Sequence, residues 1–273
     1  MSEQRLPIIL TPGDIRNHAG TAPLLLVDLG DAEAYEQGHI PGAVHLPFPT
    51  LIRQDPPAMG LLPDEASLSQ TLSSIGLTPK THVVAYDHDG GGRASRLVWT
   101  LHALGHDACS MLDGGIAAWA AAQLPLEQTP VTPTPSNYQA RIQRPEVMAD
   151  KEFLLEHLND DDVLVVDSRS PAEYDGSDRR AARGGHIPGA VNLNWIETKD
   201  PERQGRLLSD AELRARLTAL GITPERDIVT HCQTHHRSSH TYVVLKHLGY
   251  PRVRGYAGSW SEWGNDPDVP IES

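Results

Sequence analysis

The segment LLLVDLGDAEAYEQGHIPGAVHLPF, residues 24–48, is repeated later in the same chain. Its counterpart is VLVVDSRSPAEYDG at residues 163–176, followed after eight extra residues by GHIPGAVNLNW at 185–195. Each copy holds a short apolar run that ends in Asp and, further on, a GHIPGA turn. A repeat of this length indicates the duplication of a whole domain and not a solenoid with a short period.

The later parts of the two copies match as well. THVVAYDHDGGGRASRLVWTLHALGH at residues 81–106 corresponds to RDIVTHCQTHHRSSHTYVVLKHLGY at 226–250. Between the copies lies a proline-rich, polar stretch that disfavours both helix and sheet. We therefore predict a first domain at residues 1–128, a linker at 129–145 and a second domain at 146–273.

Within each copy, short β-branched runs alternate with helical segments. In the second copy the pattern predicts strands at 163–166 and 228–231 and helices at 210–220 and 238–248. Such alternation is typical of parallel sheets, whose ligands bind at the turns that leave the carboxyl ends of the strands. The sequence thus predicts an α/β protein with two similar domains, each a central parallel sheet flanked by helices on both faces.

Composition narrows the setting in which the protein works. The chain has 273 residues, a formal net charge of −13 and two cysteines. The negative charge disfavours nucleic acid as a partner, and the absence of a long apolar run disfavours a membrane association. Two cysteines cannot form a disulfide framework, so we expect reduced thiols in the cytoplasm. We also expect a monomer.

The segment HCQTHHRSSH, residues 231–240, is the strongest candidate for a functional site. It follows a predicted strand and precedes a predicted helix, so its main-chain N–H groups and the helix dipole favour an anion at Cys232. Arg237, together with His235, His236 and His240 if partly protonated, would lower the thiol pKa further. Cys232 is therefore predicted to be a nucleophile, whereas Cys109, in the apolar run HDACSML, is predicted to be structural.

A zinc site is the competing interpretation of this segment, because Cys and His are preferred zinc ligands. His231 and Cys232 are neighbours on an extended backbone, so their side chains point in opposite directions. No second cysteine or carboxylate cluster lies nearby in the sequence. We expect neither a metal nor a cofactor. The histidines of the two GHIPGA turns, His39 and His186, are expected to be structural.

Taken together, the paired GHIPGA turns, the Asp-ended strands and the cysteine loop present only in the second copy resemble the tandem-domain rhodaneses. The closing GSWSEW segment, residues 258–263, adds to this resemblance. The family transfers a sulfane sulfur, through a cysteine persulfide, from a donor such as thiosulfate to an acceptor such as cyanide. The resemblance implies an inactive first domain and a catalytic second domain with Cys232 as the nucleophile. Its implied substrate-binding loop consists of Gln233, Thr234, His235, His236, Arg237 and Ser238.

Several positions differ from the family pattern. Asp87 stands in the first copy where Cys232 stands in the second, so the first loop cannot carry a persulfide and its carboxylate could accept the loop N–H groups. Many relatives have an arginine that contacts the donor where this chain has Glu173. Arg237 must then supply much of the anion recognition, with Arg183 as a second candidate. The physiological donor and acceptor stay open.

Two alternatives to a small-molecule sulfurtransferase remain. A cysteine phosphatase of related fold uses a C-x5-R loop, but only four residues separate Cys232 from Arg237 here, which makes the ring too tight for phosphate. A persulfide carrier that delivers sulfur to a protein partner is compatible with the sequence. Steady turnover with small acceptors distinguishes an enzyme from such a carrier.

Overall fold

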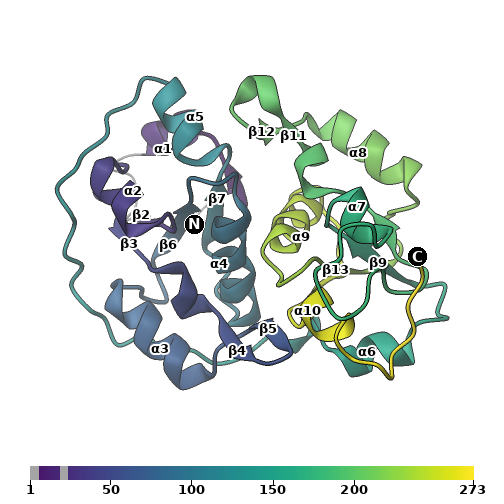
Figure 1. The fold of residues 1–273 in the computed structure, drawn as a ribbon. Coiled ribbons are helices and arrows are strands. Elements are labelled where there is room, and N and C mark those ends of the chain that lie inside the picture. The colour runs from purple at the N-terminus through teal and green to yellow at the C-terminus, as the bar shows by residue number, and fades with distance from the viewer. Residues whose placement is uncertain (1–5, 19–23) are drawn as a thin grey trace. The chain divides into compact units, whose positions relative to one another are not determined.

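Two five-stranded sheets, one in each half of the chain, organise the described residues, which are 6–18 and 24–273 of a computed structural model (Figure 1). In the first sheet the strand order is β1-β7-β6-β2-β3 and every neighbouring pair is parallel. These strands are β1 (Ile9–Leu10), β2 (Leu24–Asp28), β3 (Val44–His45), β6 (His82–Tyr86) and β7 (Cys109–Leu112).

The second sheet repeats this topology, with the order β8-β14-β13-β9-β10 and parallel pairing throughout. Its strands are β8 (Met148–Ala149), β9 (Val163–Asp167), β10 (Val191–Asn192), β13 (Asp227–His231) and β14 (Val253–Tyr256). The predicted strands at 163–166 and 228–231 are thus confirmed. β13 is the central strand, and its residues Ile228 to His231 are buried, as expected for a parallel sheet that is covered on both faces.

Helices flank both sheets (Figure 1). Those of the first half are α1 (Pro12–His18), α2 (Ala32–Gln37), α3 (Glu65–Ser74), α4 (Gly92–Ala103) and α5 (Gly115–Ala121). Those of the second half are α6 (Lys151–Glu156), α7 (Pro171–Tyr174), α8 (Asp210–Ala219), α9 (Arg237–His247) and α10 (Ser259–Trp263). Short 3-10 turns add η1 (Phe48–Leu51), η2 (Pro145–Val147), η3 (Trp195–Thr198) and η4 (Pro201–Arg203). The α/β fold predicted from the sequence is confirmed.

Each half of the chain has its own apolar core, formed by side chains of its sheet and of the helices packed on it. In the second half, Tyr256, Trp260 and Trp263 are completely buried and pack with Val229 of the central strand. In the first half, Tyr86 and Trp119 belong to the core cluster of that sheet. Among the described residues, no helix is both long and apolar enough to cross a bilayer.

The chain divides into two compact units, whose boundaries differ from those of the sequence repeats at two small hairpins. Unit 1 contains the described residues of Met1–Leu51, Pro63–Gln143 and Asp200–Leu207, and unit 2 contains Ile52–Leu62, Arg144–Lys199 and Leu208–Ser273. The hairpin β4–β5 (Arg53–Asp55, Ala58–Leu61) comes from the first repeat but belongs to unit 2. From the second repeat, β12 (Arg206–Leu207) and the end of β11 (Lys199–Asp200) belong to unit 1.

The proline-rich stretch forms no helix or strand over residues 129–144. It packs on unit 1 by hydrogen bonds to the end of α3. The main-chain N–H of Ser136 donates to Ser73 O at 2.9 Å, and that of Tyr138 donates to Ser73 Oγ at 2.9 Å. This segment is therefore held against α3 of unit 1.

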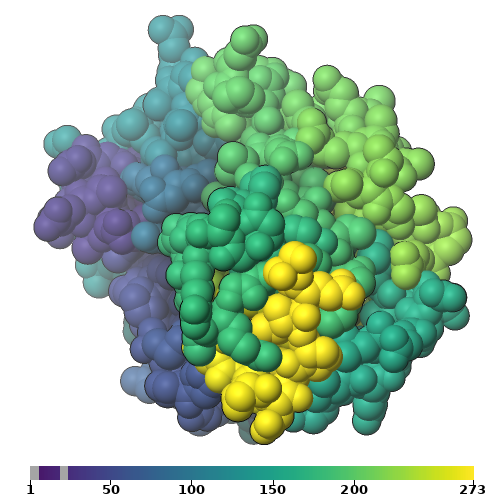
Figure 2. All heavy atoms as spheres, turned by 45° about the vertical axis from the view of Figure 1, so that its right-hand side comes forward, coloured from purple at the N-terminus to yellow at the C-terminus, as the bar shows by residue number. Residues whose placement is uncertain are grey.

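The GHIPGA turns close each repeat on its own final residues. His39 exchanges main-chain hydrogen bonds with Glu127, and His186 does so with Glu272. The imidazole rings stack on Tyr35 at 3.9 Å and on Tyr174 at 3.7 Å, and each Nδ1 contacts the carbonyl of that same tyrosine. Both histidines thus have the structural role predicted for them. In Figure 2 the C-terminal residues, in yellow, lie against the green surface of unit 2.

Candidate active site

Cys232 lies directly after the central strand β13, at its carboxyl end. The loop 232–236 leads from this strand to α9, whose first residue is Arg237. The helix begins one residue earlier than the sequence pattern predicted. Cys232 is 1% exposed, and the first residues of α9 after Arg237 are buried as well. The predicted strand, cysteine loop and helix are therefore present, and the thiol lies at their junction.

The GSWSEW segment holds this loop in place. The N–H of Trp260 donates to Cys232 O at 2.9 Å, and the N–H of Ser261 donates to Gln233 O at 3.0 Å. Ser259 Oγ accepts the N–H of Cys232 at 3.4 Å. These contacts hold the carbonyls of Cys232 and Gln233 on the GSWSEW segment, while the main-chain N–H groups of Thr234 and Ser238 hydrogen-bond Cys232. The sequence analysis used GSWSEW only as a mark of family resemblance and missed this role.

His235 shapes the loop from within. Its φ angle of 56° is in the left-handed region, which few non-glycine residues adopt. The completely buried imidazole contacts Ser238 Oγ through Nδ1 at 2.7 Å, and Ser239 Oγ donates to His235 O at 2.6 Å. Ser238 in turn hydrogen-bonds Cys232. His235 therefore orients a hydroxyl group that hydrogen-bonds Cys232.

Cys232 is activated by its surroundings. Burial alone raises the pKa of a thiol, but the charge of Arg237 and hydrogen bonds from Ser238 and Thr234 outweigh it and hold the pKa of Cys232 below its ordinary value. The thiolate is the nucleophilic form of cysteine. The direction of this shift agrees with the anion that the sequence predicts at Cys232, and the role of Cys232 as a nucleophile stays a prediction.

Arg237 is bound by a carboxylate on α7. Its two terminal nitrogens donate to the two oxygens of Glu173, at 2.6 and 2.8 Å. Glu173 is 3% exposed, and although burial opposes ionisation, Arg237 and Ser170 hold its pKa at about 2. Sequence reasoning noted Glu173 as a missing arginine but did not predict that it would pair with Arg237.

The structure corrects the expectation that His240 is partly protonated. Burial and nearby Lys199 hold the pKa of His240 well below its usual range, so His240 adds no positive charge to the site. Burial also lowers the pKa of His231 to about 4, although Asp167 lies 3.5 Å from its Nε2. Among the described residues, no cluster of three or more His, Cys, Asp and Glu side chains is arranged to hold a metal ion.

The corresponding loop of the first repeat is filled by its own carboxylate. Asp87 accepts the main-chain N–H groups of Asp89 and Gly91 on Oδ1, at 3.0 and 2.7 Å. Its Oδ2 accepts those of Arg93 and Ala94, at 2.9 and 3.0 Å. Asp87 thus accepts the loop N–H groups, as proposed from the sequence, and the first loop offers no sulfur nucleophile.

The remaining predicted residues lie elsewhere. Arg183 donates to the main-chain oxygens of Trp263, Asp266 and Val269, so these contacts anchor the C-terminal segment. Its predicted role in substrate binding rests on the sequence alone. Cys109 is 2% exposed in β7, and its Sγ contacts His106 O at 3.4 Å, in keeping with a structural thiol.

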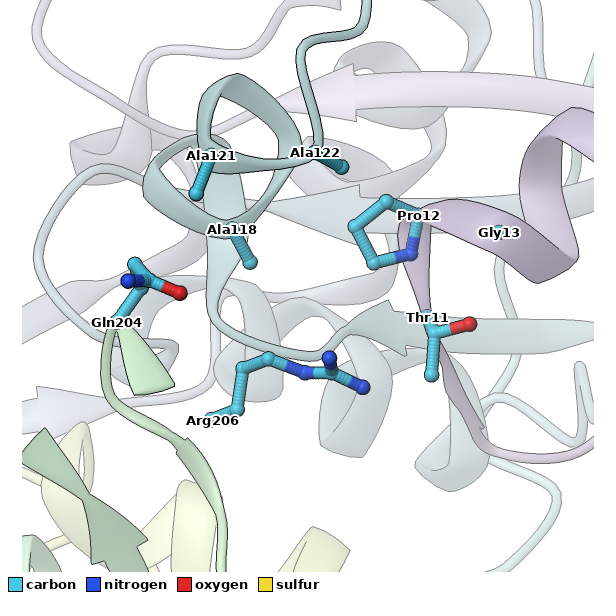
Figure 3. A pocket seen from close by; sticks show the side chains of 8 residues that line it. All are labelled: Thr11, Pro12, Gly13, Ala118, Ala121, Ala122, Gln204 and Arg206. Carbon is cyan, nitrogen blue, oxygen red and sulfur yellow. The ribbon is translucent and has the colours of Figure 1, made fainter. Parts of the chain in front are cut away.

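One pocket lies in unit 1 (Figure 3). Small side chains such as Ala118 and Ala121 line it together with Gln204 and Arg206. Nε of Arg206 donates to Asp113 at 3.0 Å. The pocket lining contains neither a cysteine nor a residue of the Cys232 loop.

Comparisons with known proteins agree with this geometry. The model of the family described as "Rhodanese-like domain" matches residues 11–122 and 150–266. The chain is 45% identical to a thiosulfate sulfurtransferase of Azotobacter vinelandii, over 98% of this chain and 97% of the relative. It is 34% identical to the sulfur carrier protein TtuD of Thermus thermophilus, over 88% of this chain and 87% of the relative.

A solved structure with the same fold is that of an anaerobic ergothioneine biosynthesis enzyme from Chlorobium limicola. It matches with a TM-score of 0.87 and 24% identity, over 97% of this chain and 70% of that one. At this identity the match shows the fold. The two matched repeats and the full-length relatives show that this chain belongs to the rhodanese family.

Proposed function

We propose that this protein is a thiosulfate sulfurtransferase that carries the transferred sulfur as a persulfide on Cys232. The observation that carries the proposal is the buried Cys232, whose pKa is lowered by Arg237, Ser238 and Thr234. The GSWSEW segment holds the loop of Cys232 in place through the loop carbonyls. The relatives named thiosulfate sulfurtransferase, matched over nearly the whole chain, support the same activity.

The chemistry follows from the loop geometry. The Cys232 thiolate attacks the outer sulfur of thiosulfate, the S–S bond of the donor breaks, and sulfite leaves with the bonding pair. The product is a Cys–S–S⁻ anion, which Thr234, Arg237 and Ser238 stabilise as they stabilise the thiolate. Cyanide carbon then attacks the terminal sulfur, so thiocyanate forms and Cys232 is released as a thiolate. No general base is needed, because the lowered pKa of Cys232 favours its thiolate form.

Reduced thiols fit this chemistry, and we propose a cytoplasmic monomer with small-molecule donors and acceptors. A protein acceptor is the second candidate partner. The relative named as a sulfur carrier supports it.

The purified protein should release thiocyanate from thiosulfate and cyanide but should not hydrolyse an aryl phosphate. Only four residues separate Cys232 from Arg237, so the loop is too small to surround a phosphate. Arg237 is also paired with Glu173, which reduces its attraction for phosphate. Thiocyanate is measured as its coloured iron complex and phosphatase activity as nitrophenolate release, with Cys232→Ser as the control. Phosphatase turnover that depends on Cys232 would overturn the spacing argument. Loading without turnover on small acceptors would favour the carrier function.

A further inference from the structure

The pair between Glu173 and Arg237 is preformed by the local fold of α7. Ser170 caps this helix: Ser170 N and Oγ donate to Glu173 Oε2 at 3.2 and 3.1 Å, and Glu173 N donates back to Ser170 Oγ. This capping box fixes the carboxylate before any ligand binds. Because Glu173 is 3% exposed, it cannot turn to solvent without leaving its packing.

The carboxylate meets the single arginine of the catalytic loop. Both terminal nitrogens of Arg237 are occupied by Glu173, in the bidentate geometry that binds an anion most strongly. Arg180, on the segment inserted in the second repeat, adds only a distant contact of 3.9 Å with Glu173 and is itself paired with Asp178. A donor that enters the loop therefore faces an arginine whose positive charge is already balanced.

We infer that Glu173 is a specificity-determining residue, which lowers the attraction of the loop for dianionic donors and favours sulfur donors with a single negative charge. The inference rests on the proposed sulfur transfer. With methanethiosulfonate as a monoanionic donor, the Cys232 thiolate takes the outer sulfur, and methanesulfinate leaves with the bonding pair. The reaction is the same as with thiosulfate, so the two donors differ at this step mainly in charge.

Glu173→Gln tests the inference because glutamine keeps an oxygen that can accept the capping-box hydrogen bond, while it removes the charge and one of the two acceptors of Arg237. The ratio of kcat/KM for thiosulfate to that for methanethiosulfonate should rise about tenfold, because the charge of Arg237 becomes available to the dianion. The alkylation rate of Cys232 should reach its midpoint at a lower pH, since a nearby negative charge has been removed.

Glu212→Gln is the matched control. Glu212 forms the same kind of capping box with Ser209 on α8, where both side chains are exposed. It should leave the donor ratio and the alkylation profile unchanged. An unchanged ratio in an active Glu173→Gln protein, or an equal loss with both donors, would overturn the inference. If the unaltered protein transferred sulfur from neither donor, the proposed function itself would fail.

A second, independent observation concerns the hairpin β4–β5. Met59 N donates to Ser261 Oγ at 3.0 Å, next to the main-chain contact of Ser261 with the catalytic loop. A Cβ atom on Gly60 would lie 2.4 Å from Thr234 O and 2.8 Å from Ala257 O. Only glycine permits this approach of the hairpin to the catalytic loop without a shift of the backbone.

We propose that Gly60 is a positioning residue for the catalytic loop, supplied by the repeat that lacks the cysteine. The hairpin braces Thr234, whose main chain hydrogen-bonds Cys232. A side chain at position 60 must push either the hairpin or Thr234 away. The first repeat thus contributes directly to the geometry of the nucleophile although its own loop is filled by Asp87.

Gly60→Ala should lower kcat/KM for thiosulfate about tenfold, since a displaced loop donor weakens anion stabilisation. It should also move the alkylation midpoint of Cys232 to higher pH. Gln54→Ala, at an exposed site of the same hairpin, is the control and should change neither. Ser261→Ala removes the acceptor of Met59 N without a clash and should shift both measurements in the same direction, less strongly. The proposal is refuted if Gly60→Ala and Ser261→Ala, like Gln54→Ala, change neither kcat/KM for thiosulfate nor the alkylation midpoint.

Discussion

Cys232→Ser should eliminate sulfur transfer, by about three orders of magnitude or more, because a serine hydroxyl cannot form a persulfide. Cys109→Ser should leave most of the activity, since that thiol is packed in β7 and lies outside the catalytic loop. Thiosulfate alone should add one sulfur atom to the peptide containing Cys232 and none to that containing Cys109. Mass spectrometry before and after removal of the donor measures this, and cyanide should then restore the free thiol.

The same experiment separates a covalent from a direct mechanism. If sulfur moves only while donor and acceptor are both present, and no loaded form survives, the persulfide route is wrong. Equal loss of activity in folded Cys232→Ser and Cys109→Ser proteins would contradict the different roles of the two thiols.

Arg237→Ala should have the second-largest effect, because it leaves the buried Glu173 carboxylate without its bidentate partner. The unpaired carboxylate repels an anionic donor and raises the pKa of Cys232, so loading by thiosulfate should slow about a hundredfold. Discharge of a preloaded persulfide should slow less. Sulfite release in a single turnover measures loading, and thiocyanate formation from loaded protein measures discharge.

Stability gives a second readout of the pair. The pKa of Glu173 is lowered to about 2, so the pair stabilises the fold above the ordinary pKa of a glutamate, and this contribution is lost as pH falls toward 2. The side chain of Arg237 is 26% exposed. We therefore expect Arg237→Ala to lower the free energy of unfolding at neutral pH by about 2 kcal/mol, less than for a fully buried pair. Glu173→Ala in addition should recover much of that loss in urea unfolding. Additive losses would show that the two residues are not coupled.

Local sequence patterns were sufficient for most of the fold and for the position of the cysteine loop. The β-branched run at 227–231 and the helical segment after it encode β13 and α9, because strand and helix periodicity depend on neighbouring residues. The polar loop between them begins with Cys232, so this residue lies at the carboxyl end of the strand. The repeat also allowed Asp87 to be compared with Cys232, which predicted correctly how its carboxylate is used.

The contacts that tune the site join residues far apart in the chain. Glu173 meets Arg237 across 64 positions, and Met59 meets Ser261 across 202. The pKa of His240 depends on its burial and on the charge of Lys199. Neither can be predicted from the residues next to His240 in the sequence. Local periodicity specifies which backbone each segment adopts, so the sequence by itself determined the duplicated α/β fold and the cysteine loop. Only the tertiary structure decided which charges and which glycine meet that loop, because packing sets those distances.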